Sequence, residues 1–416
     1  MTIEMPFTHI RRIFLTSTFL SSVGSAVSLL ALGKLFYDRS GDASGFAWAF
    51  AAEQCAQVLG LVFAGPLVDR YDPLRMAIAA DTLRGVAFLI CAVATLFGFW
   101  QAALGCALAG GLLKPLHRAA LFRWIPSVTS GPHLAAMNGS HGSAMQMGSL
   151  LGTGLAGLLL AVVPAGVLVA FDGLTYLFSA FSLRRVAKPS ALFNPQIPET
   201  PTTLSKLLGI DAWVATIRVV FSNPLLLLRI VLSSGDFLVV AFFNVFLIPY
   251  CATVLGRGPW AASLLDGGFA FGAIGVGWLF ARFHRAAESS LVYFSAFFAT
   301  SAAFLALGMS RDLFASLSAC VVIGLGSRMT LAVNTAGLQQ ASPQAHLGRV
   351  SIIRTGLVSF WSLLVVAPAA KFVGDKLEHG YLLASMVIFV FLGLATFVTW
   401  KTQSLRRKGS PEEESL

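Results

Sequence analysis

The stretch Gly65–Arg75 has the sequence GPLVDRYDPLR, and the fold of this 416-residue chain is decided here. It is a short, turn-forming link between two long apolar segments. Asp69 stands where the first segment ends and Pro73 where the second begins, which is a typical stop and start pair for helices. Four formal charges between segments of membrane-spanning length indicate that two transmembrane helices meet water at this link.

The overall composition excludes a soluble globular protein. Hydrophobic residues make up 56% of the chain and charged residues 12%, whereas a soluble domain is about a quarter charged. The apolar residues fall into blocks of roughly 20, the length that crosses a bilayer as a helix. We therefore predict an all-α polytopic membrane protein with twelve transmembrane helices. The expected segments are 12–36, 45–69, 76–99, 102–122, 138–161, 165–184, 225–249, 260–281, 289–309, 312–334, 350–372 and 380–401.

The net charge of +10 is explained by membrane topology. With the amino terminus in the cytoplasm, most of the 29 lysines and arginines fall in inner loops and at inner helix ends. This is the positive-inside pattern, so both termini are predicted to be cytoplasmic and no nucleic acid partner is needed. The five cysteines lie inside apolar segments without paired spacing, which favours neither a disulfide framework nor a metal site.

One long connection, 185–224, separates two sets of six segments and is broken by four prolines. Apolar residues at helical spacing within it, with Asp211 and Arg218 on the other face, predict an amphipathic helix on the cytoplasmic surface of the bilayer. A plain linker helix is the alternative. The predicted domains are a six-helix bundle at 1–184, the cytoplasmic linker at 185–224, a second six-helix bundle at 225–402 and a cytoplasmic tail at 403–416.

The two halves of the chain resemble each other at a nearly constant offset. Gly65–Tyr71 aligns with Gly277–Phe283, and Lys114 aligns with Arg328. A repeat in the same orientation predicts two six-helix bundles related by an axis along the membrane normal, the parallel-repeat arrangement of some transporters.

The pattern of Gly65, Leu67, Asp69, Arg70 and Arg75 resembles the signature loop between helices 2 and 3 of the major facilitator superfamily of transporters. Asp72 and Pro73 replace a glycine and an arginine that are common there. The segments 36–41, 78–84 and 171–177 resemble the bacterial drug and metabolite efflux branch of this superfamily, which includes macrolide and siderophore exporters. The resemblance implies a substrate site at the midplane between the two bundles.

Four glycines in the expected fifth helix partly match the antiporter motif of the same family, with Thr153 where a proline is usual. They are Gly148, Gly152, Gly154 and Gly157. The resemblance implies exchange of a substrate for protons. The alternative is close helix packing, which small residues four apart favour in any membrane bundle.

The charged link is predicted to act as a conformational latch built from Gly65, Asp69, Arg70 and Arg75. Asp69 is expected near the start of the eleventh helix, where an anion gains about 0.3–1 kcal/mol from the helix dipole. Together with Arg75 it would hold the cytoplasmic side shut, and protonation would release it. A solvated loop charge is the alternative.

Ionisable residues inside the expected helices form a second candidate group. Burying each charged side chain in the membrane costs free energy unless it is paired with an opposite charge or reached by water. Asp236 is the main candidate for proton coupling or substrate binding, and a structural pair with Arg229 or Asn244 is its alternative role. Lys114 and Arg328 would favour an anionic or carboxylate-bearing substrate, unless they extend to the headgroups. The full set of candidates is Asp236, Glu53, Arg229, Lys114, Arg328, Asn244 and Gln57.

The chain contains no Walker loop, nucleophile elbow or His/Cys cluster at ligand spacing, so we predict no enzyme activity, no cofactor and no metal site. The leading hypothesis is a monomeric transporter in the bacterial inner membrane that exports a small amphiphilic drug or metabolite in exchange for protons. An importer or lysolipid flippase of the same fold is one alternative. A non-transporting membrane sensor or scaffold is another.

Overall fold

The computed structural model describes residues 7–40, 44–130, 132–186, 210–257, 259–283, 290–361, 380–391 and 393–394. Within these residues the chain is almost entirely helical and contains no strand. The first half forms α1 (Phe7–Ser40), α2 (Ser44–Arg70), α3 (Pro73–Leu96), α4 (Ala102–Val128), α5 (Pro132–Leu159) and α6 (Ala165–Val186). The rest forms α8 (Ile210–Ser222), α9 (Pro224–Thr253), α10 (Pro259–Arg282), α11 (Ser290–Met309), α12 (Leu313–Ala341), η2 (Gln344–His346), α13 (Leu347–Trp361) and an apolar helix at Gly380–Phe391.

Seven of the described helices are long and apolar enough to cross a membrane: Thr8–Phe36, Pro73–Leu96, Ala165–Val186, Leu226–Leu247, Trp260–Phe280, Val292–Met309 and Leu313–Ala341. Each of the twelve expected segments contains a described helix or part of one. The all-α membrane fold predicted from the sequence is therefore confirmed. The later parts of the segments 350–372 and 380–401 lie outside the described residues.

Several helices begin at a capping side chain that the sequence places at the water-facing edge. Asp72 accepts a hydrogen bond from the backbone N–H of Arg75 at 2.9 Å, which starts α3. Asn223 caps α9 in the same way through the N–H of Leu226 at 3.1 Å, and Asp312 caps α12. Each such cap contributes about 1 kcal/mol. Because Asp72 caps α3, the link after α2 turns within two residues.

The chain divides into two compact units. Unit 1 comprises 1–130, 143–216 and 343–352, and unit 2 comprises 131–142, 217–342 and 353–416. The first turn of α13 thus belongs to unit 1, although it lies late in the sequence. The domain boundaries expected from the sequence stay a prediction.

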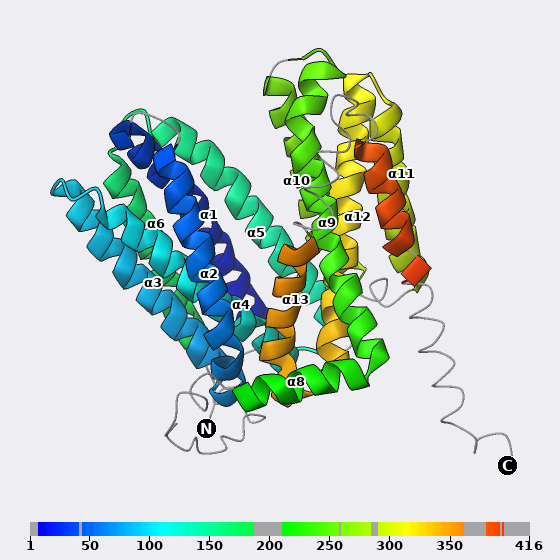
Figure 1. Ribbon diagram of the computed structural model, residues 1–416, viewed down its shortest axis with the longest axis horizontal. Coiled ribbons are helices and arrows are strands. Elements are labelled where there is room, and N and C mark those ends of the chain that lie inside the picture. Colours follow the sequence, from blue (N-terminus) through cyan, green and yellow to red (C-terminus); the bar gives the residue numbers. More distant parts are fainter. Residues whose placement is uncertain are drawn as a thin grey trace, which may run out of the picture. The chain divides into compact units, whose positions relative to one another are not determined.

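Unit 1 is built from helices that pack lengthwise against one another. Within it α2 packs against α4, α1 packs against α6, and α3 packs against both α4 and α6 (Figure 1). Phe88 of α3 meets the ring of Tyr176 of α6 edge-on, with ring centroids 5.4 Å apart. Such a pair adds about 0.5–1.5 kcal/mol beyond area burial. The α3–α6 contact thereby holds the polar side chains of both helices in fixed positions.

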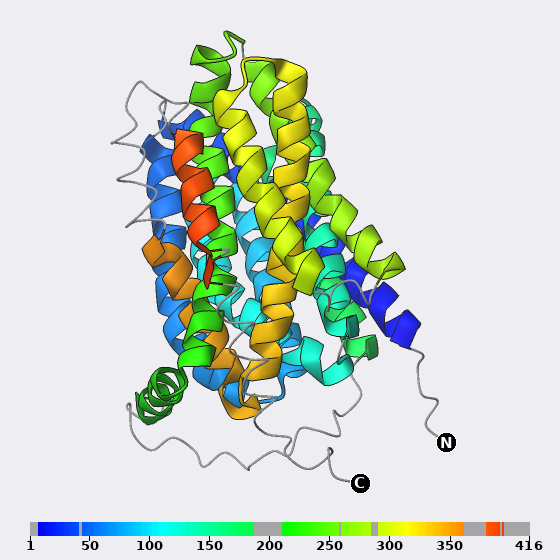
Figure 2. The same ribbon diagram turned by 90° about the vertical axis from the view of Figure 1, so that its right-hand side faces the viewer.

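In unit 2, α12 packs against α9, α10 and α11 (Figure 2). A Cβ on Gly324 of α12 would fall on the carbonyl oxygen of Phe269, so α10 and α12 touch backbone to backbone. Phe243 of α9 stacks on Phe269 at 4.8 Å between ring centroids. These contacts pack α9 and α12 against α10, and α9 and α12 carry most of the buried polar groups described in this unit.

The short helix α8 has two faces, as the sequence predicts. Thr216 and Val220 are buried. The opposite face carries a row of exposed apolar side chains: Ile210, Val214, Ile217 and Phe221. The part of the amphipathic helix expected before Ile210 lies outside the described residues, and contact of this row with the bilayer stays a prediction.

The glycine motif of α5 differs from one position to the next. A Cβ on Gly152 would fall on the carbonyl oxygen of Val23 in α1 and lie 2.8 Å from Cβ of Ala26. Gly148 is equally close to α1, whereas nothing lies within 4 Å of a Cβ on Gly154. Close helix packing thus accounts for Gly148 and Gly152. The surroundings of Gly157 are not among the described features.

We expect Gly152→Ala to lower the thermal midpoint of the purified protein and Gly154→Ala to leave it unchanged or raise it slightly. Alanine is a better helix former than glycine by about 1 kcal/mol, so both variants gain locally. At Gly152 the added methyl group forces α1 and α5 apart, which outweighs this gain. Melting both variants in the same detergent checks the prediction, and equal midpoints would contradict it.

Candidate functional site

Asp69 lies in the last turn of α2, and its side chain is 4% exposed. Its Oδ1 accepts a hydrogen bond from the backbone N–H of Gly348 at 2.8 Å. Its Oδ2 accepts one from the N–H of Arg349 at 3.2 Å and lies 3.2 Å from Nε of the same residue. The carboxylate therefore caps the first turn of α13, where unpaired N–H groups and the helix dipole favour an anion.

Two glycines allow this close approach. A Cβ on Gly348 would lie 2.7 Å from Oδ1 of Asp69, and a Cβ on Gly65 would lie 2.8 Å from Cγ of Arg349. Both distances are shorter than real Cβ contacts, so larger residues would push α13 away from α2. Gly65 thus lies at the contact, as the sequence predicts.

A second layer of polar contacts surrounds Arg349. Its Nε donates to Oγ1 of Thr216 in α8 at 2.6 Å, and its Nη2 donates to the carbonyl of Ala345 at 2.8 Å. Nη1 of Arg123 in α4 lies 3.9 Å from Oδ1 of Asp69. We call Asp69, Arg123, Thr216, His346, Gly348 and Arg349 the latch cluster; all of its members belong to unit 1.

The remaining latch candidates lie beside this cluster. Arg70 is half-buried and Arg75 is exposed. The interactions described for Asp69 involve Arg349 and Arg123, and Arg75 takes part through its backbone N–H in the cap of α3. A latching role for Arg70 and Arg75 stays a prediction.

His346 is held as an uncharged acceptor within the latch cluster. Its Nδ1 lies 2.8 Å from Oγ1 of Thr216 and 3.3 Å from Nη2 of Arg349. A guanidinium only donates, so this nitrogen accepts. Partial burial and the positive charge of Arg349 lower the pKa of His346 below its ordinary value of 6.5.

We expect the contribution of His346 to stability to be lost as the pH falls below 6.5. Because the pKa of His346 is lower in the folded protein, the unfolded chain binds this proton first, and acidification favours unfolding. His346→Asn keeps an acceptor and removes the titration, so its thermal midpoint should fall less between about pH 8 and pH 5. Identical pH profiles for the variant and the wild type would contradict this role.

Asp236 lies in the middle of α9 and is 3% exposed. Oγ1 of Thr330 donates to its Oδ1, and Nδ2 of Asn334 donates to its Oδ2 at 3.0 Å. Asn334 in turn accepts from the hydroxyl of Tyr293 at 2.5 Å. Both carboxylate oxygens are therefore held in place by neutral donors of α12.

Two arginines complete the surroundings of Asp236. Arg328 of α12 and Arg354 of α13 are near enough to act on its charge. Nε of Arg354 donates to the carbonyl of Ser233, one turn before Asp236 on α9. A buried carboxylate beside two guanidinium groups has its charge balanced within the protein.

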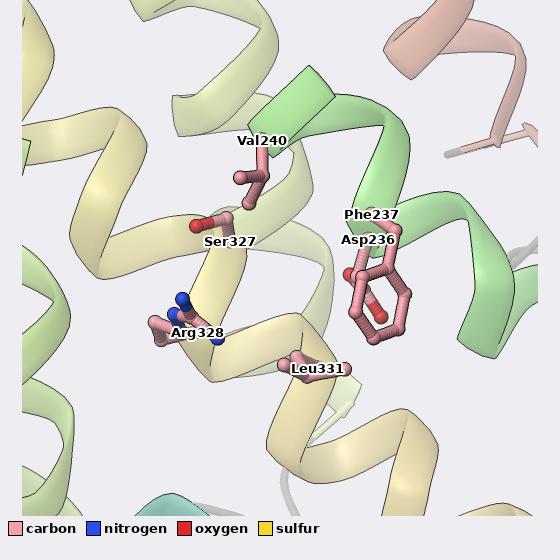
Figure 3. A pocket seen from close by; sticks show the side chains of 6 residues that line it. All are labelled: Asp236, Phe237, Val240, Ser327, Arg328 and Leu331. Carbon is pink, nitrogen blue, oxygen red and sulfur yellow. The ribbon is translucent and has the colours of Figure 1, made fainter. Parts of the chain in front are cut away.

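A small cavity of about 80 Å³ opens beside this carboxylate. Figure 3 shows it between α9 and α12. It is lined by Asp236, Phe237, Val240, Ser327, Arg328 and Leu331. An acid, a base and apolar side chains thus face one space, whose size suits a small polar group of a ligand with apolar atoms beside it.

The structure brings some of the other candidates together and leaves others apart. Nζ of Lys114 in α4 lies 3.5 Å from Oε1 of Glu53 in α2, so these two form an ion pair. Arg229 approaches Gly337 of α12. Asn244 is exposed, and its Nδ2 donates to the carbonyl of Val240 on its own helix at 2.9 Å. Gln57 is half-buried on α2.

Sequence reasoning placed Asp69 near Gly348 and Arg349, as the structure shows, but it did not find Thr330, Asn334 or Arg354. For Thr330 and Asn334 a signal existed, because two polar residues four apart in an apolar helix share one face. The ion pair between Asp69 and the side chain of Arg349, 280 positions away, was not predicted. Within the described part of the chain, no three His, Cys, Asp or Glu side chains gather as a metal site requires.

The comparisons with known proteins agree with this architecture. The family model of the Major Facilitator Superfamily matches residues 14–366. The crystal structure of a bacterial homologue of the iron transporter ferroportin in the outward-facing state is similar, with a TM-score of 0.71 and 15% identity over 94% of this chain and 99% of that one. No curated protein sequence matches.

Two further solved structures share the fold. The human organic anion transporter MFSD10 (TETRAN) has a TM-score of 0.73 and 14% identity, covering 94% of this chain and all of that one (100%). A single-residue variant of the E. coli fucose:proton symporter FucP has a TM-score of 0.66 and 13% identity, covering 95% of this chain and 99% of that one. At these identities the similarity shows the fold alone.

Proposed function

The chain belongs to the Major Facilitator Superfamily, and we propose that it is a proton-driven exporter of a small amphiphilic drug or metabolite. The family and the multiple apolar helices make it a multi-pass membrane transporter. The bacterial inner membrane, cytoplasmic termini and a monomeric state belong to the proposal and rest on the charge distribution and resemblance of the sequence.

The observation that carries the proposal is the buried Asp236 with its cavity. Burying a carboxylate in a transmembrane helix, where it is 3% exposed, costs free energy that pairing must offset. Acids in such places commonly mark a functional site. Thr330 and Asn334 hold it in one orientation, and the cavity beside it also presents Arg328. We assign this place to a polar group of the substrate, with apolar contact from Phe237 and Leu331.

The latch cluster supplies the conformational step of alternating access. Asp69 holds the first turn of α13 in unit 1, and α13 continues into unit 2 after Ile352. Releasing this turn changes the contacts of a helix that both units share. We place this step on the cytoplasmic side, where closing and opening the latch would alternate with substrate release outside.

A thermal-shift screen of the purified protein tests substrate binding. Erythromycin, enterobactin and a lysophosphatidylethanolamine represent the macrolide, siderophore and lysolipid classes. At least one of them should raise the thermal midpoint of the wild type, and Asp236→Asn should lose this shift. A shift of the same size in the variant would remove Asp236 from the site. A shift with the lysolipid alone would favour a flippase.

A further inference from the structure

A second buried polar cluster lies in unit 1, far in the sequence from Asp236. Asp81 of α3 is fully buried, with 0% of its side chain exposed. Its Oδ1 pairs with Arg84 and lies 3.1 Å from Nδ1 of His117 in α4. Its Oδ2 accepts a hydrogen bond from Oγ of Ser179 in α6 at 2.7 Å. Three helices therefore meet at one carboxylate, and one of its neighbours is a histidine.

His117 is the least buried member of this cluster. Its side chain is 19% exposed, whereas that of Asp81 is 0% exposed. One turn before it on α4, Lys114 is 39% exposed and pairs with Glu53 of α2. Part of the imidazole thus lies at the surface of unit 1, while its Nδ1 is buried against Asp81.

The charges around His117 balance when the imidazole is neutral. The acids facing this region are Asp81 of α3, Glu53 of α2 and Asp172 of α6. The bases are Arg84 of α3 and Lys114 and Arg118 of α4. Tyr176 of α6 lies under Arg84, and α1 contributes the hydroxyl of Ser25 against Tyr176. One added proton on His117 changes this balance by a full charge.

Within the described residues, Nδ1 of His117 forms no hydrogen bond of good geometry although it is buried. A neutral nitrogen lone pair 3.1 Å from a carboxylate oxygen repels it, whereas a protonated nitrogen donates a charge-assisted hydrogen bond to it. Histidine exchanges its proton near neutral pH. The cluster therefore has two states that differ by one proton and one hydrogen bond.

We propose that Asp81 and His117 form the proton-binding site of the transport cycle, with the proton on Nδ1 of His117 shared with Oδ1 of Asp81. This proposal rests on the proposed function, since it names the site of the coupling ion. The lone pair of Nδ1 takes the proton from water on one side of the membrane and returns it to water on the other. Proton and substrate then bind in different units, and conformational change couples them.

A pH titration observed by NMR tests the binding step. The full-length protein is labelled with ¹⁵N at its seven histidines, and His117→Gln identifies the signal of His117. This signal should show the gain of a proton on Nδ1 as the sample is acidified. Asp81→Asn removes the carboxylate that stabilises the protonated imidazole, so the midpoint of this change should move to lower pH. A His117 signal that keeps one protonation state throughout would overturn the proposal.

Two further variants guard against a purely structural effect. Ser179→Ala removes a donor to Asp81 without changing charge, so Asp81 should bind the histidine proton more tightly and the midpoint should rise. His133→Gln changes an exposed histidine of α5 and should leave the midpoint unchanged. A midpoint that moves downward in Ser179→Ala as it does in Asp81→Asn would contradict the assignment.

Coupling is tested in proteoliposomes with an imposed pH gradient and erythromycin or enterobactin as the probe. Wild-type liposomes should accumulate a probe against its gradient, and His117→Gln liposomes should only equilibrate it. Equal gradient-driven accumulation in both would overturn the proton site and leave the proposed function standing. Wild-type liposomes could show no gradient-driven accumulation although the NMR signal of His117 gains a proton. That result would overturn proton coupling itself.

Discussion

Asp69→Asn is expected to free the first turn of α13 and to stop transport. The amide can still accept one backbone N–H bond, but its NH₂ group would face the donors of Arg349. The guanidinium of Arg349 would lose a carboxylate 3.2 Å away in a mostly buried place. Breaking such a pair costs about 3–5 kcal/mol.

Hydrogen exchange measured by mass spectrometry checks this result on peptides that cover Pro343–Ile352. A loss of about 3 kcal/mol corresponds to exchange roughly a hundredfold faster at these amides. Asp72→Asn is the matched control, because Asp72 lies in the same link and caps α3. The control should leave the exchange of these amides unchanged. Equal exchange in Asp69→Asn and the wild type would refute the latch.

Asp236→Ala is expected to lower stability strongly, whereas Asp236→Asn is expected to fold and fail in binding. Alanine leaves the donors of Thr330 and Asn334 without an acceptor and removes the charge that balances Arg354. The cost is about 3 kcal/mol for a broken buried network. Asparagine fills the space and keeps an acceptor, so the fold survives while the negative charge is lost.

Thermal midpoints from size-exclusion melting separate the two variants. Asp236→Ala should melt well below the wild type, and Asp236→Asn should melt between the two, because it keeps an acceptor but loses the charge that balances Arg354. Asp266→Asn changes an exposed acid of α10 and serves as the control that should not alter the midpoint. If Asp236→Ala had the same thermal midpoint as Asp266→Asn, the carboxylate of Asp236 would not stabilise the packing of α9 against α12.

The sequence predicts the helices well because the bilayer imposes their length and composition. Residues 76–99 were expected as one segment, and the helix is Pro73–Leu96, since Asp72 caps it three residues earlier. Asp69 and Gly65 were predicted at a latch from the charged link. The start of the eleventh helix was expected beside them, whereas the ion pair with the side chain of Arg349 depends on tertiary packing, which local patterns do not predict.

The buried network around Asp236 was only partly predictable. The intramembrane acid itself is conspicuous, because an unpaired charge in an apolar segment is costly. Its proposed alternative partner Asn244 bonds to its own helix, whereas Thr330 and Asn334 of α12 hold the carboxylate. Which polar residue of which helix faces Asp236 depends on the rotation of α12, and backbone contact at Gly324 sets that rotation.

Proton antiport in everted membrane vesicles tests the central claim most directly. The vesicles are acidified inside by respiration, and a pH-sensitive dye reports the proton gradient while erythromycin, enterobactin or the lysolipid is added. At least one probe should make the lumen of wild-type vesicles less acidic, and vesicles with Asp236→Asn should not respond. Identical dye signals from wild-type vesicles, Asp236→Asn vesicles and vesicles without the protein would contradict it.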